Sequence, residues 1–330
     1  MVTVPAIAPN EVRRRSLPLR GIAAQGKGKE MAYALAHTGE VVAALESYFG
    51  IEYPFDKLDM IAVPDKRGAM ENAGAITFGE WFLTLDEASA PTAQKRAFWS
   101  ITTHELAHQW FGDLVTCRDW SHAWLNEGFA TFMEHIDREH HLGRDEYDYS
   151  VKGDLDAYLG EARGRYRRPI VCQDYDAPID IFDRHLYEKG ACVLHLLRRE
   201  LGDETFWKGV NLYLTRHAKS VVETRDLMRA LEDVSGRGLE RFFEQWVLRA
   251  GHPELSIKIE HASGVCTATV KQTQPSGPPA KESASHSSAP DMAVPVFAFD
   301  LAFDIATASG VRREGTGSMS SSSSRGGLVL

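Results

Sequence analysis

The chain has 330 residues, of which 43% are apolar and 25% are charged. This composition is typical of a globular protein with a sizeable core, and it excludes a chain that is disordered along its whole length. The 37 Lys and Arg residues against 46 Asp and Glu residues give a net charge of −9. Binding to a phosphate backbone needs clustered basic side chains, so nucleic acid is not an expected partner.

The apolar residues and cysteines bear on the compartment. No run of about 18 uninterrupted apolar residues occurs, so we expect no membrane span, and residues 1–10 are too short for a secretory signal. The four cysteines, at positions 117, 172, 192 and 266, are widely spaced and form no CxxC pair. This spacing argues against a disulfide scaffold and against a thiolate zinc site. We therefore expect free thiols and a cytoplasmic protein.

The predicted strands come early in the chain and the predicted helices late. Residues 28–49 have apolar side chains at helical spacing and stop at Gly50, whereas residues 58–63 and 75–85 alternate in part and predict strands. Strands followed by helices predict an α+β region whose two lobes meet near residues 100–130. The further predicted helices are 92–111, 121–141, 144–159, 186–201, 204–217, 223–234 and 239–249.

The character of the sequence changes after Gly251. Residues 255–260 and 265–272 alternate like strands, and residues 294–305 resume this pattern. Between them lies a segment rich in Ser, Pro, Ala and Gly, which is typical of a linker. The end of the chain includes five consecutive serines and is predicted to be disordered.

Two histidines lie four residues apart in the predicted helix 92–111, in the order His104-Glu105-Leu106-Ala107-His108. At about 3.6 residues per turn, both imidazoles lie on one helix face and can bind one metal ion. Glu105 lies near the same face, where it can accept a proton from water on the metal. The competing interpretation is a surface helix with two unrelated histidines.

A third ligand separates these interpretations, because catalytic zinc binds three protein ligands and keeps one position open for water. The HExxHxxGxxH arrangement is excluded, since Phe111 and Leu114 stand where its glycine and third histidine are required. Glu127 follows His108 after 18 intervening residues, which is enough to end one helix, turn and enter another. The spacing therefore predicts zinc ligation by His104, His108 and Glu127, with one ion per chain.

This ligand set also predicts the chemistry. Two neutral imidazoles and one carboxylate leave a zinc site with a net charge of about +1, so the ion would acidify water and polarise a carbonyl group. With Glu105 as general base, the residues predict a metal-assisted hydrolase.

Three motifs together resemble those of a known family. Gly68-Ala69-Met70-Glu71-Asn72, the HExxH motif with Glu127, and Tyr187-Glu188-Lys189-Gly190 occur in the order and spacing of the zinc aminopeptidases that include aminopeptidase N, puromycin-sensitive aminopeptidase and leukotriene hydrolase. The resemblance extends from about residue 16 to residue 255. It implies an α+β fold: a thermolysin-like zinc peptidase domain with a small mixed β lobe and a larger helical lobe, followed by a partial β-sandwich.

The resemblance implies roles for the matching residues. Glu71 would hold the free α-amino group of a peptide, which favours a charged amine over an acetylated or internal peptide. Tyr187 would donate a hydrogen bond to the oxyanion, since a phenol stays protonated near neutral pH. The other substrate-binding residues implied, in part through their backbone, are Gly68, Ala69, Met70 and Asn72.

The resemblance also divides the chain. Residues 63–67, before Gly68, lack an aromatic residue that is usual in the family. This segment is also one residue shorter than in family members, and such a difference can shift the loop that carries Glu71. The predicted parts are residues 1–15 as the remnant of an N-terminal β-domain, 16–250 as the catalytic domain, 251–310 as a partial β-sandwich with a linker at 273–291, and 311–330 as a disordered tail.

The function implied is that of a zinc-dependent aminopeptidase. It would hydrolyse the N-terminal peptide bond of peptides through a zinc-activated water, with Glu105 as general base. One alternative is a truncated, catalytically impaired fragment that binds peptides, because family members usually carry further domains. Another is an epoxide hydrolase-like activity, for which the sequence offers no dedicated feature.

Overall fold

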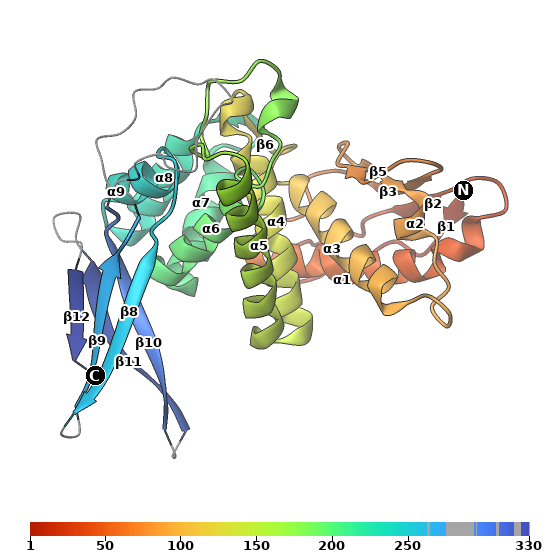
Figure 1. The fold of residues 1–330 in the computed structure, drawn as a ribbon. Helices are drawn as coiled ribbons and strands as arrows, with labels where there is room; N and C mark the ends of the chain where they lie inside the picture. The colour runs from red at the N-terminus through yellow and green to blue at the C-terminus, as the bar shows by residue number, and fades with distance from the viewer. Residues whose placement is uncertain (263–264, 275–293, 295, 308–309, 320–324, 330) are drawn as a thin grey trace. The chain divides into compact units, whose positions relative to one another are not determined.

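The computed structural model describes residues 1–262, 265–274, 294, 296–307, 310–319 and 325–329 (Figure 1). The chain forms two compact units. The first unit comprises Met1–Leu159 and Ile170–Phe243, and the second comprises Gly160–Pro169 and Glu244–Leu330. The mixture of helices and small sheets agrees with the α+β class predicted from the sequence.

The first unit begins with a five-stranded sheet in the order β1-β2-β3-β5-β4. Strands β2 (Leu19–Ile22), β3 (Leu58–Val63) and β5 (Ala75–Gly79) run parallel to one another. Strand β1 (Val2–Thr3) pairs antiparallel with β2, and β4 (Ala69–Met70) pairs antiparallel with β5. Strand β4 therefore lies at an edge of the sheet.

The predicted strand at 75–85 is wrong beyond Gly79, because helix α2 (Glu80–Leu83) begins there. A short apolar run cannot be assigned to strand or helix by its pattern alone. Gly79 packs tightly at this transition: a Cβ atom on it would lie 2.3 Å from the carbonyl oxygen of Lys66. The short helix buries Leu83 completely.

Helix α1 (Ala32–Phe49) packs against β2 and against helix α3 (Thr92–His108), as Figure 1 shows. It follows a short 3-10 helix, η1 (Gly28–Met31), and ends at Gly50, whose φ of 63° is the left-handed conformation that favours glycine. Phe49 at its end is fully buried and contacts two aromatic rings that follow α3. Those rings belong to Trp110 and Phe111.

A buried ion pair ties the start of the chain to α1. Arg13 Nε donates to Glu46 Oε1 at 2.9 Å, and both side chains are fully buried. The same carboxylate oxygen accepts the backbone N–H of Tyr53 at 2.9 Å. Residues 1–15 thus supply an internal partner to the first unit.

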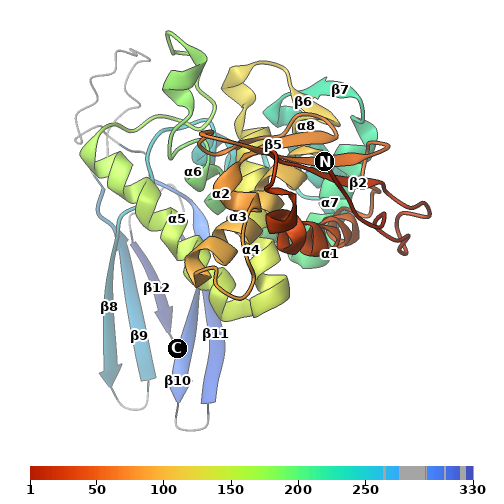
Figure 2. The ribbon, with the colours of Figure 1, turned by 90° about the vertical axis from the view of Figure 1, so that its right-hand side faces the viewer.

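Among the later helices, α4 contacts both α3 and α6, and α7 contacts α6 and α8. Strands β6 (Val115–Cys117) and β7 (Ser220–Val222), which were not predicted, form a parallel pair beside α8 (Figure 2). Strands of three residues are too short for a detectable alternation. The helices are α4 (Trp124–Leu142), α5 (Arg144–Gly164), α6 (Glu188–Leu201), α7 (Asp203–Arg216), α8 (Thr224–Ser235) and α9 (Glu240–Trp246), and η2 (Trp120–His122) and η3 (Pro178–Ile181) are 3-10 helices. The last residues of α5 and of α9 belong to the second unit.

Helices α4 and α6 approach each other at two glycines. A Cβ atom on Gly128 would lie 3.2 Å from the Cα of Gly190, and one on Gly190 would lie 3.0 Å from the Cα of Gly128. Because neither residue has a side chain, the backbones can meet at this point. The contact brings the start of α6, where Tyr187 stands, close to Glu127 on α4.

The second unit contains mainly strands. The sheet β12-β9-β8 consists of β8 (Leu255–Ala262), β9 (Val265–Gln272) and β12 (Arg325–Val329), and β10 (Phe299–Thr307) pairs with β11 (Gly310–Met319). Residues 311–330 were expected to be disordered, whereas the structure has strands at 310–319 and 325–329 because strand pairing can satisfy the backbone of Ser- and Gly-rich segments. The predicted linker at 273–291 lies almost entirely outside the described residues.

Among the described residues, no helix is both long enough and apolar enough to cross a membrane.

We expect Gly190→Ala to lower the free energy of unfolding by about 1 kcal/mol or more, because the new methyl group is forced against the backbone of α4. Gly153→Ala is the matched control. Gly153 lies within α5 with no atom within 4 Å of an added Cβ, so this change should raise stability by about 0.5–1 kcal/mol. Urea unfolding of both variants is the measurement, and equal midpoints would contradict the close packing.

Candidate metal centre

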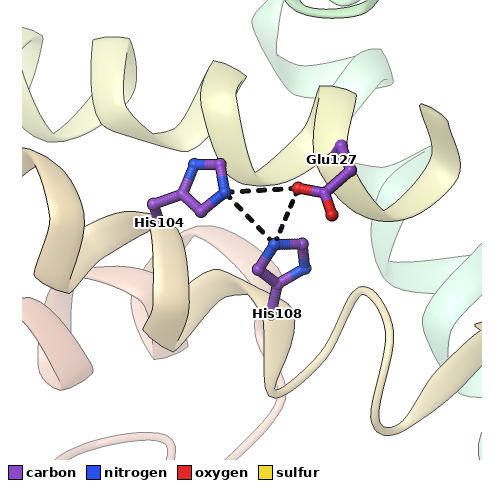
Figure 3. Close-up of side chains that lie close together, drawn as sticks. All are labelled: His104, His108 and Glu127. Atoms are coloured by element: carbon purple, nitrogen blue, oxygen red, sulfur yellow. Dashed lines mark hydrogen bonds and ion pairs between the residues drawn. The ribbon is translucent and has the colours of Figure 1, made fainter. Parts of the chain in front are cut away.

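Three side chains from two helices point toward one another in Figure 3. His104 and His108 lie on the last turns of α3, and Glu127 lies on the first turn of α4. The Nε2 atoms of the two histidines are 3.2 Å apart. Glu127 Oε2 lies 3.3 Å from His104 Nε2 and 3.1 Å from His108 Nε2. The structure therefore brings together all three residues that the spacing predicted as ligands.

The outer nitrogen of each imidazole has a partner that can only accept a hydrogen bond. His104 Nδ1 donates to Glu134 Oε1 at 2.9 Å, and His108 Nδ1 donates to the carbonyl oxygen of Phe111 at 2.9 Å. In a neutral imidazole the inner nitrogen then has a lone pair and no hydrogen. Two nitrogen lone pairs and one carboxylate oxygen thus converge on the same point.

This donor set fits a zinc ion. Tetrahedral zinc with bonds of about 2.0–2.1 Å holds its ligand atoms about 3.3 Å apart, and the three distances here are 3.1–3.3 Å. Three converging lone pairs repel one another unless a cation lies between them. Nitrogen and carboxylate donors in this number are those of a catalytic zinc site, in which a fourth position stays open.

The pKa values of both histidines are raised, which shows that the cluster favours positive charge. Burial opposes a charge on His108, but the charge of Glu127 and its hydrogen bond raise the pKa of His108 to about 9. In His104 burial likewise opposes the shift, yet hydrogen bonds to Glu127 and Glu134 raise its pKa well above the usual value. Metal ions compete with protons for such groups.

Glu105 lies on α3 between the two histidines and is buried. Burial raises its pKa to about 7, against the opposing charges of His104 and His108. Its Oε2 atom has no hydrogen-bond partner within the described part of the chain. A carboxylate without a partner and with a pKa near neutrality can exchange a proton with a reactant.

Tyr187 immediately precedes α6, and its ring lies nearly parallel to that of His104, with 6.2 Å between the centroids. The pKa of Tyr187 is raised, first by burial and then by the negative charges of Glu127 and Glu71. The phenol therefore stays protonated and can donate a hydrogen bond. The close approach of Gly128 and Gly190 keeps this residue near the three converging atoms.

The motif at residues 68–72 forms the edge strand β4 and the turn after it. Gly68, with a φ of 68°, accepts a hydrogen bond from the N–H of Gly79 at 2.8 Å. Bonded and non-bonded pairs alternate along antiparallel strands, so Ala69, opposite Phe78, forms a non-bonded pair. The N–H and C=O groups of Ala69 consequently point away from β5, toward the open edge of the sheet.

Glu71 is half-buried and lies close to the converging ligands. Its charge contributes to the raised pKa values of Glu105 and of Tyr187. It also acts on Asp113, whose pKa is raised to about 7 by burial first and then by Glu71. Negative charge thus gathers beside the cluster, on the side of the motif at residues 68–72.

Two residues of the site were missed in the sequence. Glu134 lies on α4, two turns after Glu127, and holds the outer nitrogen of His104. Gln109 directly follows His108 and contacts the turn that carries Glu71. The spacing of seven residues between Glu127 and Glu134 places both on one helix face, a signal that could have identified the second carboxylate.

We expect Glu134→Ala to weaken zinc binding by about 10–100-fold, because it removes the acceptor that orients His104. The control is Glu139→Ala on the same helix, whose carboxylate binds Arg198 instead of a histidine of the cluster. Competition with a chelator gives the zinc affinity of each variant. If Glu134→Ala binds zinc as tightly as the unaltered chain, the orienting role is wrong.

Comparisons with known proteins agree with this geometry. The model of the peptidase family M1 domain matches residues 33–246. Aminopeptidase M1-A of Oryza sativa subsp. japonica is 36% identical over 264 residues, which cover 78% of this chain and 29% of that protein. Aminopeptidase M1 of Arabidopsis thaliana is 38% identical over 243 residues, covering 71% and 27% respectively.

An archaeal relative matches a similar region. The tricorn protease-interacting factor F2 of Thermoplasma volcanium is 40% identical over 216 residues, which cover 64% of this chain and 28% of that protein. The matched region thus spans less than a third of the length of each of these relatives. The matches confirm the resemblance to the zinc aminopeptidase family, and the chain belongs to peptidase family M1.

Proposed function

We propose that this chain is the catalytic part of a zinc aminopeptidase that removes the N-terminal residue of peptides. The observation that carries this proposal is the convergence of His104 Nε2, His108 Nε2 and Glu127 Oε2 beside Glu105, whose Oε2 has no hydrogen-bond partner among the described residues. The names of the plant relatives, which are aminopeptidases, support the same activity. His104, His108 and Glu127 would hold the zinc ion.

When bound, zinc lowers the pKa of water and polarises a carbonyl group. The chain's own residues then carry the proton. Glu105 accepts a proton from the attacking water while the new C–O bond forms, and it donates that proton to the amine as the C–N bond breaks. A pKa of about 7, raised mainly by burial, suits a group that must both accept and donate near neutral pH.

Tyr187 would stabilise the negative charge that develops on the carbonyl oxygen. Its phenol is close to the cluster and stays protonated, since burial first and then the surrounding carboxylates raise its pKa. A fixed donor of this kind acts on the transition state more than on the ground state. Tyr187 and Glu105 are therefore the proposed catalytic residues.

The open edge of the five-stranded sheet would bind the peptide backbone. The N–H and C=O groups of Ala69 on β4 point outward, which is the arrangement needed to pair with an extended chain. Glu71 comes two residues later and would bind the α-ammonium group of the substrate. The substrate-binding residues proposed are Gly68, Ala69, Met70, Glu71 and Asn72.

The proposal extends to the architecture and the compartment. The small sheet followed by the helices around α4 supports a thermolysin-like arrangement of two lobes within residues 16–250. The antiparallel strands of the second unit support a partial β-sandwich at residues 251–310. The thiols of Cys117, Cys172 and Cys192 are free, which is consistent with a cytoplasmic protein.

Glu105→Gln should keep one zinc ion per chain and lose at least about 10²–10⁴-fold in kcat, because an amide cannot accept the proton. The measurements are zinc content by mass spectrometry and turnover of an aminoacyl arylamide. His104→Ala is the contrasting variant, since it should lose the metal itself. A Glu105→Gln protein that turns over substrate normally would contradict the general-base role.

A peptide amide and its N-acetylated twin test the proposed substrate class. We expect cleavage of the free-amino peptide only, because acetylation removes the charge that Glu71 would bind. Glu71→Gln should lower kcat/KM for the free-amino peptide by about 100-fold. Equal cleavage of both twins would refute the aminopeptidase assignment, and a zinc-loaded chain that cleaves neither would favour the peptide-binding fragment.

A further inference from the structure

The side chain of Gln109 is fully buried between the zinc-binding helix and the motif at residues 68–72. Its Oε1 atom accepts the O–H of Tyr53 at 2.8 Å and the N–H of Gly74 at 2.9 Å. Its Nε2 atom donates to the carbonyl oxygen of Glu71 at 2.6 Å and to Asp113 Oδ2 at 2.9 Å. All four hydrogen-bonding positions of the amide are therefore used.

These partners fix the orientation of the amide. The Gly74 N–H can only donate to Oε1, and the Glu71 carbonyl can only accept from Nε2. The Tyr53 hydroxyl, which can donate or accept, donates to Oε1 here. A flipped amide would place its NH₂ group against the Gly74 N–H and its oxygen against the Glu71 carbonyl. In a buried site this arrangement is rigid, because each lost hydrogen bond leaves an unsatisfied group.

Gln109 connects the end of helix α3 to the turn at residues 71–74. It directly follows His108, so its backbone is fixed by the end of the zinc-binding helix. Its side chain forms hydrogen bonds with both ends of the turn, with the carbonyl oxygen of Glu71 and with the N–H of Gly74. Gly74 itself has a φ of 64°, which a hydrogen bond at this point helps to hold.

We propose that Gln109 is a positioning residue that sets the place of Glu71 relative to the metal ligands, and thereby the preference for a free amino terminus. The effect on substrate preference rests on the proposed function. The positioning itself is a property of the folded chain. Asp113, the fourth partner, adds negative charge on the same side of the turn.

A second buried glutamine on the same helix provides a matched control. Gln94 is also buried, and its Nε2 atom donates to the carbonyl oxygens of Trp81 at 2.8 Å and Thr84 at 3.3 Å. These bonds tie α3 to α2 and its end, and they involve none of residues 68–74. Gln94→Met and Gln109→Met therefore remove the same chemical group from the same helix at different places.

The first readout is hydrogen exchange at the Gly74 amide, followed by NMR or by mass spectrometry of a peptide that covers it. We expect at least tenfold faster exchange in Gln109→Met and no change in Gln94→Met. Tyr53→Phe removes one of the four bonds and should give a smaller increase, which keeps the test available if Gln109→Met does not fold. Unchanged exchange in Gln109→Met, or in Tyr53→Phe if only that variant folds, would overturn the positioning role.

The second readout is selectivity per zinc-loaded chain. We expect the ratio of kcat/KM for the free-amino peptide to that for its acetylated twin to fall at least tenfold in Gln109→Met, since small displacements of a positioning group are costly. Zinc content should not change. An equal fall in Gln94→Met, or faster exchange with an unchanged ratio, would overturn the link to selectivity. An unaltered chain without any preference would refute the proposed function, while hydrogen exchange still decides the positioning role.

Discussion

The structure depends on one electrostatic constraint, the convergence of two imidazole nitrogens and a carboxylate oxygen within 3.3 Å of one another. In the neutral imidazoles each inner nitrogen has a lone pair, because the outer nitrogen donates, in His104 to Glu134 and in His108 to the Phe111 carbonyl. Lone pairs at this separation repel in a buried site unless a cation compensates them. The cluster therefore needs positive charge, which protons on His104 and His108 or a metal ion can supply.

Packing elsewhere in the first unit positions the residues beside this cluster. The meeting of Gly128 and Gly190 sets α6 against α4, so that Tyr187 stands beside the cluster. A chain of buried bonds reaches the other side: Arg13 binds Glu46, which in turn holds the backbone of Tyr53. The hydroxyl of Tyr53 donates to Gln109 Oε1, and the Gln109 amide bonds to the turn that carries Glu71. The turn proposed to bind substrate is thus hydrogen-bonded to Gln109, the residue that follows His108.

The convergence of His104, His108 and Glu127 could be predicted because their geometry is local. His104 and His108 lie one helical turn apart, and a glutamate 18 residues later needs only a turn between two helices. The partners of these residues depend on tertiary contacts: Glu134 offered only its seven-residue spacing from Glu127, and Gln109 offered no signal. The misassigned strand beyond Gly79 and the missed strands β6 and β7 have the same origin, since segments this short are set by neighbours that the sequence pattern does not contain.

The most direct test of the central claim is the anomalous scattering of crystals of the zinc-loaded chain, recorded on either side of the zinc absorption edge. The expected result is a single strong peak about 2.0–2.2 Å from His104 Nε2, His108 Nε2 and a carboxylate oxygen of Glu127. Bound zinc in any other place, or no peak between these three side chains at full zinc occupancy, would contradict the account.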